Sequence, residues 1–77
     1  MIAKPSREEQ KQTLLALARQ RAPRPLLIGP SAVHLGWWAT LNDTEDILEE
    51  LVKEGVLRHA TRPECRWFGI RFGYLLV

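Results

Sequence analysis

Four arginines in the C-terminal third of the chain are the side chains best suited to binding chemistry. They are Arg58, Arg62, Arg66 and Arg71, and the N-terminal region adds Lys11. A guanidinium presents a planar fork of donors that matches a phosphate group, and a row of them can hold a nucleic-acid backbone or enter a minor groove. The alternative is an ordinary charged surface, because edge strands commonly carry charge. Arg62, at the tip of an expected turn, is the best nucleic-acid candidate.

Acidic side chains are concentrated in the middle of the chain. Residues 41 to 55 hold six acidic groups and one basic group. Four of the carboxylates, together with two polar neighbours, lie at the start of an expected helix: Asp43, Glu45, Asp46 and Glu49, with Asn42 and Thr44. Such carboxylates complement the positive end of a helix dipole, which is the favoured interpretation, or they dock on a basic partner. On DNA, Asn42 could pair with adenine, but the acidic neighbours repel phosphate.

Metal and catalytic chemistry are not expected. His34, His59 and Cys65 are the only soft metal ligands, and they lack the short paired spacings of zinc sites. No Gly-rich phosphate loop, nucleophile elbow or zinc-hydrolase motif occurs. We therefore expect no cofactor, no metal and no enzymatic activity.

Length and composition limit the class of protein. A chain of 77 residues with 45% hydrophobic content suits a single domain over residues 1–77. One cysteine cannot form an intrachain disulfide, so the reducing cytoplasm is the expected compartment. No apolar run approaches the roughly 20 residues of a membrane span, and no signal-peptide pattern follows the N-terminal methionine. A net charge of +2 argues only weakly for a polyanionic partner.

Three helices are expected in the first 55 residues. The first begins at a capping box, Ser6 to Glu9, carries a buried stripe that includes Leu14 and Leu17, and stops at Pro23. After a short strand over Leu26-Leu27-Ile28, a second helix of barely two turns begins at Pro30, with Ser31 as a local cap, and ends at Gly36. The third begins near Asp43, buries Ile47, Leu48, Leu51 and Val52, and ends at Gly55.

A hairpin is expected after Gly55. Val56 to Ala60 can extend as a strand, Thr61 to Glu64 can form the turn, and Cys65 to Val77 can return. The return strand would place one set of residues on a core face at period two: Phe68, Ile70, Phe72, Tyr74 and Leu76.

Trp37, Trp38 and Trp67 admit two interpretations. They could stack on bases. A domain this small needs bulky core residues, however, so packing in the core or in a subunit interface is favoured.

Two stretches carry a resemblance to a known family: Ala32-Val33-His34-Leu35-Gly36, and Leu48 through Arg58. Together with the expected order of elements, these stretches resemble the winged helix-turn-helix superfamily. Leu48, Leu51 and Gly55 match the leucine pair of that family's recognition helix and the glycine that follows it. The resemblance implies an α+β winged-helix fold: helix, short strand, helix, helix and two-stranded wing. The linker from Gly36 to Thr44 is longer than the family's tight turn, and the recognition helix would be acidic.

Two functional hypotheses follow. The first, implied by the resemblance, is a transcriptional or replication-associated regulator that binds double-stranded DNA mainly through its wing and first helix; its contacts would be Arg58, Arg62, Arg66, Arg71, Lys11, Asn42 and Thr44. The alternative is a protein-interaction module that docks on a basic protein through Asp43, Glu45, Asp46 and Glu49. A homodimer is possible in either case, because the C-terminal residues are apolar on both strand faces.

Overall fold

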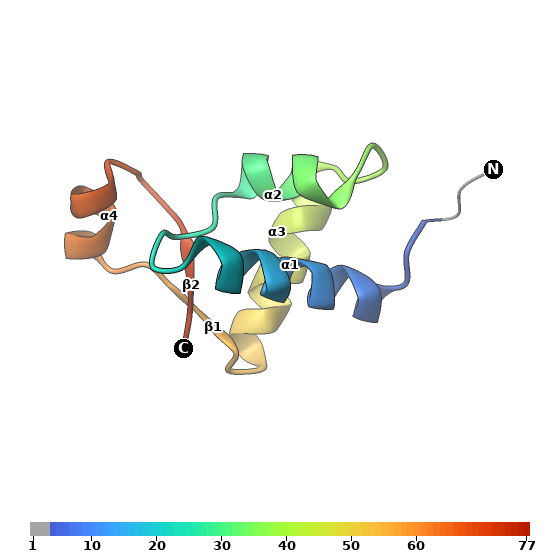
Figure 1. Ribbon diagram of the computed structural model, residues 1–77, viewed down its shortest axis with the longest axis horizontal. Coiled ribbons are helices and arrows are strands. Elements are labelled where there is room, and N and C mark those ends of the chain that lie inside the picture. Colours follow the sequence, from blue (N-terminus) through green and yellow to red (C-terminus); the bar gives the residue numbers. More distant parts are fainter. Residues whose placement is uncertain (1–3) are drawn as a thin grey trace.

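The computed structural model describes residues 4–77, which form an α+β fold (Figure 1). Its elements in order are α1 (Arg7–Arg21), α2 (Ile28–Leu35), α3 (Leu41–Lys53), β1 (Leu57–His59), α4 (Arg62–Phe68) and β2 (Tyr74–Leu76). The α+β class and the first three helices are confirmed. The fourth helix was not expected from the sequence.

Local capping explains most of the helix boundaries. The Ser6 hydroxyl accepts a hydrogen bond from the Glu9 amide, which starts α1 as expected. Gly55 has a φ of 81°, a left-handed conformation that suits glycine, and it follows the end of α3. The start of α3 was predicted about two residues too late, because Thr40 is the residue whose hydroxyl accepts from the Asp43 amide.

The segment between α1 and α2 departs from its expectation. Leu26 makes only an isolated bridge with Tyr74, through two backbone hydrogen bonds of 2.7 and 2.9 Å. Ile28 already belongs to α2, so the three-residue strand is wrong beyond Leu26. Ser31 does not cap the helix either: it lies inside α2 and is fully buried.

The core forms where α1, α3 and the hairpin meet. α1 contributes Leu14, Leu17 and Ala18, and α3 contributes Ile47, Leu48 and Leu51, as their spacing predicts. The connection and hairpin add Leu26, Leu57 and Tyr74. None of the three tryptophans belongs to this core, so burial of aliphatic side chains and one tyrosine holds the elements together.

The hairpin is much shorter than expected. β1 and β2 are antiparallel, with Leu57 opposite Leu76 and His59 opposite Tyr74. The return strand starts at Tyr74 and not at Cys65, because α4 and a loop take its first half. The predicted period-two face, Phe68, Ile70, Phe72, Tyr74 and Leu76, is therefore wrong: only its last two members are in the strand, and Leu75 is buried beside Tyr74.

Gly73, at the end of the hairpin next to α4, permits the contact between the hairpin and the segment before α2. A Cβ added at Gly73 would lie 2.8 Å from the Pro25 Cβ and 2.9 Å from the Ile70 Cδ1. Only glycine allows this approach without displacement, and the approach lets Leu26 pair with Tyr74 next to it.

Candidate nucleic-acid interface

Helix α4 stands at the tip of the hairpin, apart from the body formed by α1, α2 and α3 (Figure 1). None of its residues is buried. Its ends are set locally: Thr61 and Glu64 form a reciprocal capping box, Pro63 occupies the first turn, and Gly69 ends the helix with a φ of 67°. The sequence Thr61-Arg62-Pro63-Glu64 contains the capping box and the proline, but these residues were expected to form a turn. The tip is therefore a helix that presents side chains without a core of its own.

Arg58 fastens this helix to β1. Its two terminal guanidinium nitrogens donate to the two carboxylate oxygens of Glu64 at 2.7 and 2.8 Å. This pairing, followed by the hydrogen bond from the Thr61 backbone, lowers the pKa of Glu64 to about 2. Arg58, predicted to contact DNA, is engaged in an ion pair within the chain that positions α4.

The exposed side of α4 carries cations and an indole. Arg62 and Arg66 are one helical turn apart, as are Pro63 and Trp67, and these four residues line one hollow. Trp67 is 83% exposed. Arg71, in the loop after α4, is also exposed. The structure therefore brings Arg62 and Arg66 together in one hollow and leaves Arg71 exposed in the loop that follows the helix.

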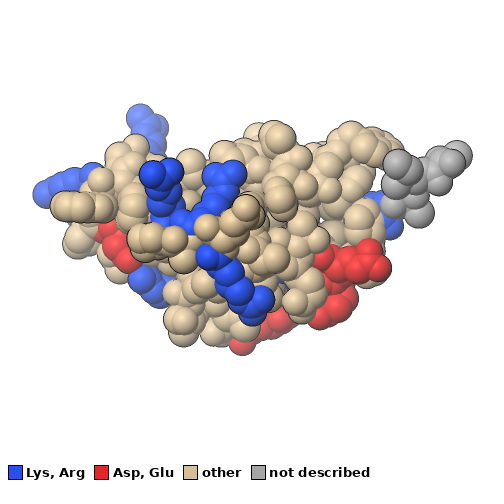
Figure 2. Space-filling model, viewed as in Figure 1, with Lys and Arg blue, Asp and Glu red and all other residues tan. Residues whose placement is uncertain are grey.

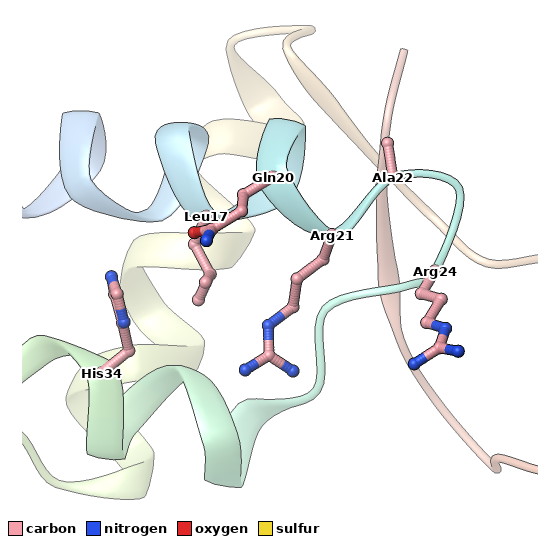
Figure 3. A pocket seen from close by; sticks show the side chains of 6 residues that line it. All are labelled: Leu17, Gln20, Arg21, Ala22, Arg24 and His34. Carbon is pink, nitrogen blue, oxygen red and sulfur yellow. The ribbon is translucent and has the colours of Figure 1, made fainter.

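Two further hollows extend this region across the end of α1. One, next to Trp67, is lined by Arg21, Arg24, Pro25, Leu27, Trp67, Phe68 and Ile70. The other, shown in Figure 3, shares Arg21 and Arg24 with it and adds Leu17, Gln20, Ala22 and His34. In that view Arg21 extends from α1 toward α2, and His34 extends from α2 toward α1. Sequence reasoning did not select Arg21 or Arg24.

We call the residues Arg21, Arg24, Arg62, Arg66 and Trp67 the basic–aromatic surface. No aspartate or glutamate lines any of its three hollows. Within residues 4–77, none of its four arginines lies in an ion pair with a carboxylate. Figure 2 shows lysine and arginine over the part of the molecule that holds α4 and the end of α1, with most of the visible acidic residues toward the lower right. The surface thus groups four arginines around one exposed indole, in hollows that share Arg21, Arg24 and Trp67 as lining residues.

Two carboxylates near the C-terminal end of α3 are paired with cations of α1. Glu50 accepts from Arg7 at 2.8 Å and pairs with Lys11 at 3.2 Å, and Lys11 also pairs with Glu54. The hydrogen bond from Arg7 and then that from Lys11 lower the pKa of Glu50, while the bond to Glu54 raises the pKa of Lys11. Lys11 therefore joins α1 to α3 and does not face a ligand.

Glu49 has internal partners as well. One of its carboxylate oxygens accepts from the Tyr74 hydroxyl and contacts His59 Nε2 at 2.7 Å. The hydrogen bond from Tyr74, followed by that from His59, lowers the pKa of Glu49. Burial and the bond to Glu49 raise the pKa of Tyr74. Glu49 joins α3 to the hairpin, so it differs from the other carboxylates predicted to dock on a partner.

The first turn of α3 divides into buried and exposed residues. Thr44 is fully buried and donates to the Thr40 carbonyl at 2.8 Å, so its predicted DNA contact has no route to solvent. Asn42 is exposed, as are Glu45 and Asp46, and Asp43 is half-buried. Here Asn42 has carboxylates for neighbours and no flanking cation to hold a phosphate.

The tryptophans do not fill the core, so the core packing expected for them is wrong, while their packing in a subunit interface stays a prediction. Trp37 is 82% exposed and, with Val33 and Leu41, lines an apolar hollow between α2 and α3. Trp38 is half-buried, and its ring lies 5.3 Å from the Lys4 ammonium nitrogen. Aliphatic residues and Tyr74 fill the core instead, and two indoles are left on the surface.

Comparison of the chain with protein-family models, with curated protein sequences and with solved structures gave no match. Among the described residues, no helix has both the length and the apolar character needed to cross a membrane. The function is therefore inferred from the residues and their geometry.

Proposed function

We propose that this protein binds double-stranded DNA through the basic–aromatic surface and the neighbouring Arg71. In this proposal the chain is a winged-helix protein with a regulatory role in transcription or replication. Its body is α1 to α3, its wing is the β1–β2 hairpin, and α4 forms the tip of that wing. The order of elements supports the assignment, since two helices precede a third that leads through Gly55 into a two-stranded hairpin.

One observation carries the proposal: the division of the basic side chains into paired and unpaired sets. Arg7, Lys11 and Arg58 are held by carboxylates. In the described chain, Arg21, Arg24, Arg62 and Arg66 have no such partner, and all four are exposed and adjoin connected hollows. Guanidinium groups that are not neutralised from within retain their full attraction for phosphate.

The proposed contacts differ from those expected from the sequence. Arg62, Arg66 and Arg71 remain, and Arg21 and Arg24 join them. Arg58 and Lys11 are assigned to structural ion pairs, and Thr44 to the interior. Asn42 is omitted because its neighbours on α3 are acidic.

The alternative function, docking on a basic protein, has its own support. Glu45 and Asp46 are exposed and Asp43 is partly so, and in the described chain no cation pairs with them. Glu49 is no longer part of this candidate surface, because Tyr74 and His59 engage it. The same set of variants tests both functions.

The test is a titration of labelled, mixed-sequence duplex DNA with the protein, followed by fluorescence anisotropy at several salt concentrations. Replacing Arg62 and Arg66 with alanine should lower the salt slope by about 2 and weaken binding at about 0.1 M salt by tens of fold, because each lost phosphate contact removes about one unit of slope. The matched control, Glu45→Gln with Asp46→Asn, should bind as tightly as wild type or more tightly.

Unchanged affinity in the arginine double variant would refute binding through α4. Absence of duplex binding by the folded wild-type protein, together with capture of a basic peptide that is lost in the Glu45 and Asp46 variant, would establish the alternative function.

A further inference from the structure

Trp67 differs from the other large apolar side chains near the unpaired arginines because it lines two of the hollows. It lines the hollow that contains Arg62 and Arg66, and also the hollow that contains Arg21 and Arg24. It therefore stands between two pairs of cations, on a helix with no buried residue. Its 83% exposure means that the fold gains little from its apolar area.

An intact duplex offers such an indole little to bind. The faces of paired bases are covered by their neighbours in the stack, and arginines alone suffice for phosphate contacts. An unpaired base, by contrast, exposes its faces, and stacking of a base on an aromatic side chain does not depend on sequence. Cations on both sides of the indole could hold the phosphates that flank that base.

From this arrangement we infer that Trp67 stacks on an unpaired base, so that the basic–aromatic surface favours DNA with a single-stranded segment joined to a duplex. Arg62 and Arg66 contact the phosphate on one side of the stacked base, and Arg21 and Arg24 contact that on the other. The inference rests on the proposed DNA-binding function and refines its ligand. Binding in this way involves no covalent step.

Trp37 supplies a matched control within the same chain. It is 82% exposed, nearly as much as Trp67. Its hollow is lined by Gly29, Ala32, Val33, Gly36, Ala39 and Leu41 and contains no cation. Losing Trp37 removes an indole of nearly equal exposure from a hollow that no lysine or arginine lines.

The experiment compares three labelled DNAs of one sequence: a blunt duplex, the same duplex with a single-stranded tail, and the tail strand alone. Anisotropy titrations at fixed salt are made with wild type and with Trp67→Ala, Trp67→Phe and Trp37→Ala, each checked for folding by circular dichroism. Wild type should bind the tailed duplex more tightly than the blunt one. Trp67→Ala should lose about fivefold to a hundredfold of affinity for the tailed duplex and much less for the blunt duplex, whose bases remain stacked, so that the preference for the tailed duplex is reduced.

Trp67→Phe should keep most of the preference, because phenylalanine retains a stacking face, and Trp37→Ala should match wild type. Equal binding of blunt and tailed duplexes by wild type, or an undiminished preference in Trp67→Ala, would overturn the inference. If blunt duplex binding still depends on Arg62 and Arg66 in that case, the proposed function survives alone. If no DNA binds, both proposals fail.

Discussion

Helices α3 and α4 are held in place by different forces. α3 buries Ile47, Leu48 and Leu51 in the core. Helix α4 buries no residue and is held by a capping box and the paired hydrogen bonds between Arg58 and Glu64. Charged residues on α3 or at its end also form ion pairs with α1, whereas within residues 4–77 the arginines of α4 form none. Because α4 contributes little to the core, its exposed side chains are available to contact a ligand.

Removing one core leucine from α3 is the most direct test of this contrast. Leu48→Ala should lower the free energy of unfolding by about 2–5 kcal/mol, because it leaves a cavity among fully buried neighbours. Trp67→Ala on α4 should change it by less than about 0.5 kcal/mol, since the indole is exposed. Urea unfolding followed by circular dichroism measures both. Comparable losses in the two variants would break the contrast.

The end of the hairpin next to α4, where Gly73 contacts the segment before α2, should show an intermediate effect. Gly73→Ala should lower the free energy of unfolding by about 1–3 kcal/mol, because the new Cβ would lie 2.8 Å from the Pro25 Cβ and crowd the Ile70 side chain. Gly29→Ala is the control: apart from its chain neighbours, nothing lies within 4 Å of its added Cβ, and Gly29 is inside α2. That change should alter stability by less than about 1 kcal/mol, because the higher helix propensity of alanine is opposed by crowding of the new Cβ against the following Pro30. A loss of equal size in both variants would argue against steric crowding at Gly73.

The smallest effect concerns the polar link between α3 and the hairpin. The pKa of Glu49 lies below its ordinary value of 4.5, chiefly because of the hydrogen bond from Tyr74. A lowered pKa means that the folded state favours the carboxylate, so this stability is present above the ordinary pKa and is lost as pH falls through the folded one.

Wild type should therefore lose stability more steeply than Glu49→Gln as pH falls below 4.5. Glu50 and Glu64 also titrate low, but they are present in both proteins and cancel in the difference. Urea midpoints measured at intervals through this range give the comparison. Parallel pH profiles would show that the contacts of Glu49 contribute nothing to folding.

Local signals in the sequence predicted much of the fold. Ser6, Gly36 and Gly55 mark helix ends because caps and left-handed residues act within a few positions of the chain. α4 was missed although its signal was equally local. Alternating apolar residues from Phe68 onward predicted a strand, and the capping box at Thr61 competed with that pattern. Helix formation prevailed, supported by Gly69 as its end and by the Arg58–Glu64 pair.

The candidate surface was predictable only in part. Arg62, Arg66 and Arg71 were selected because they are close in sequence on the expected wing. Arg21 and Arg24 were not, because no local pattern brings the end of α1 next to Trp67. Their proximity depends on the pairing of Leu26 with Tyr74 and on the close approach at Gly73.

Composition and spacing alone determined the basic, acidic and basic segments, the amphipathic stripes of α1 and α3, and most helix ends, because these depend on residues near one another in the chain. Only the tertiary structure decided which charges are neutralised. Arg7, Lys11 and Arg58 pair with carboxylates, whereas Arg62 and Arg66 pair with none in the part of the chain that the structure describes. An ion pair requires two groups within a few ångströms, and for residues far apart in sequence that distance is set by the packing of the core.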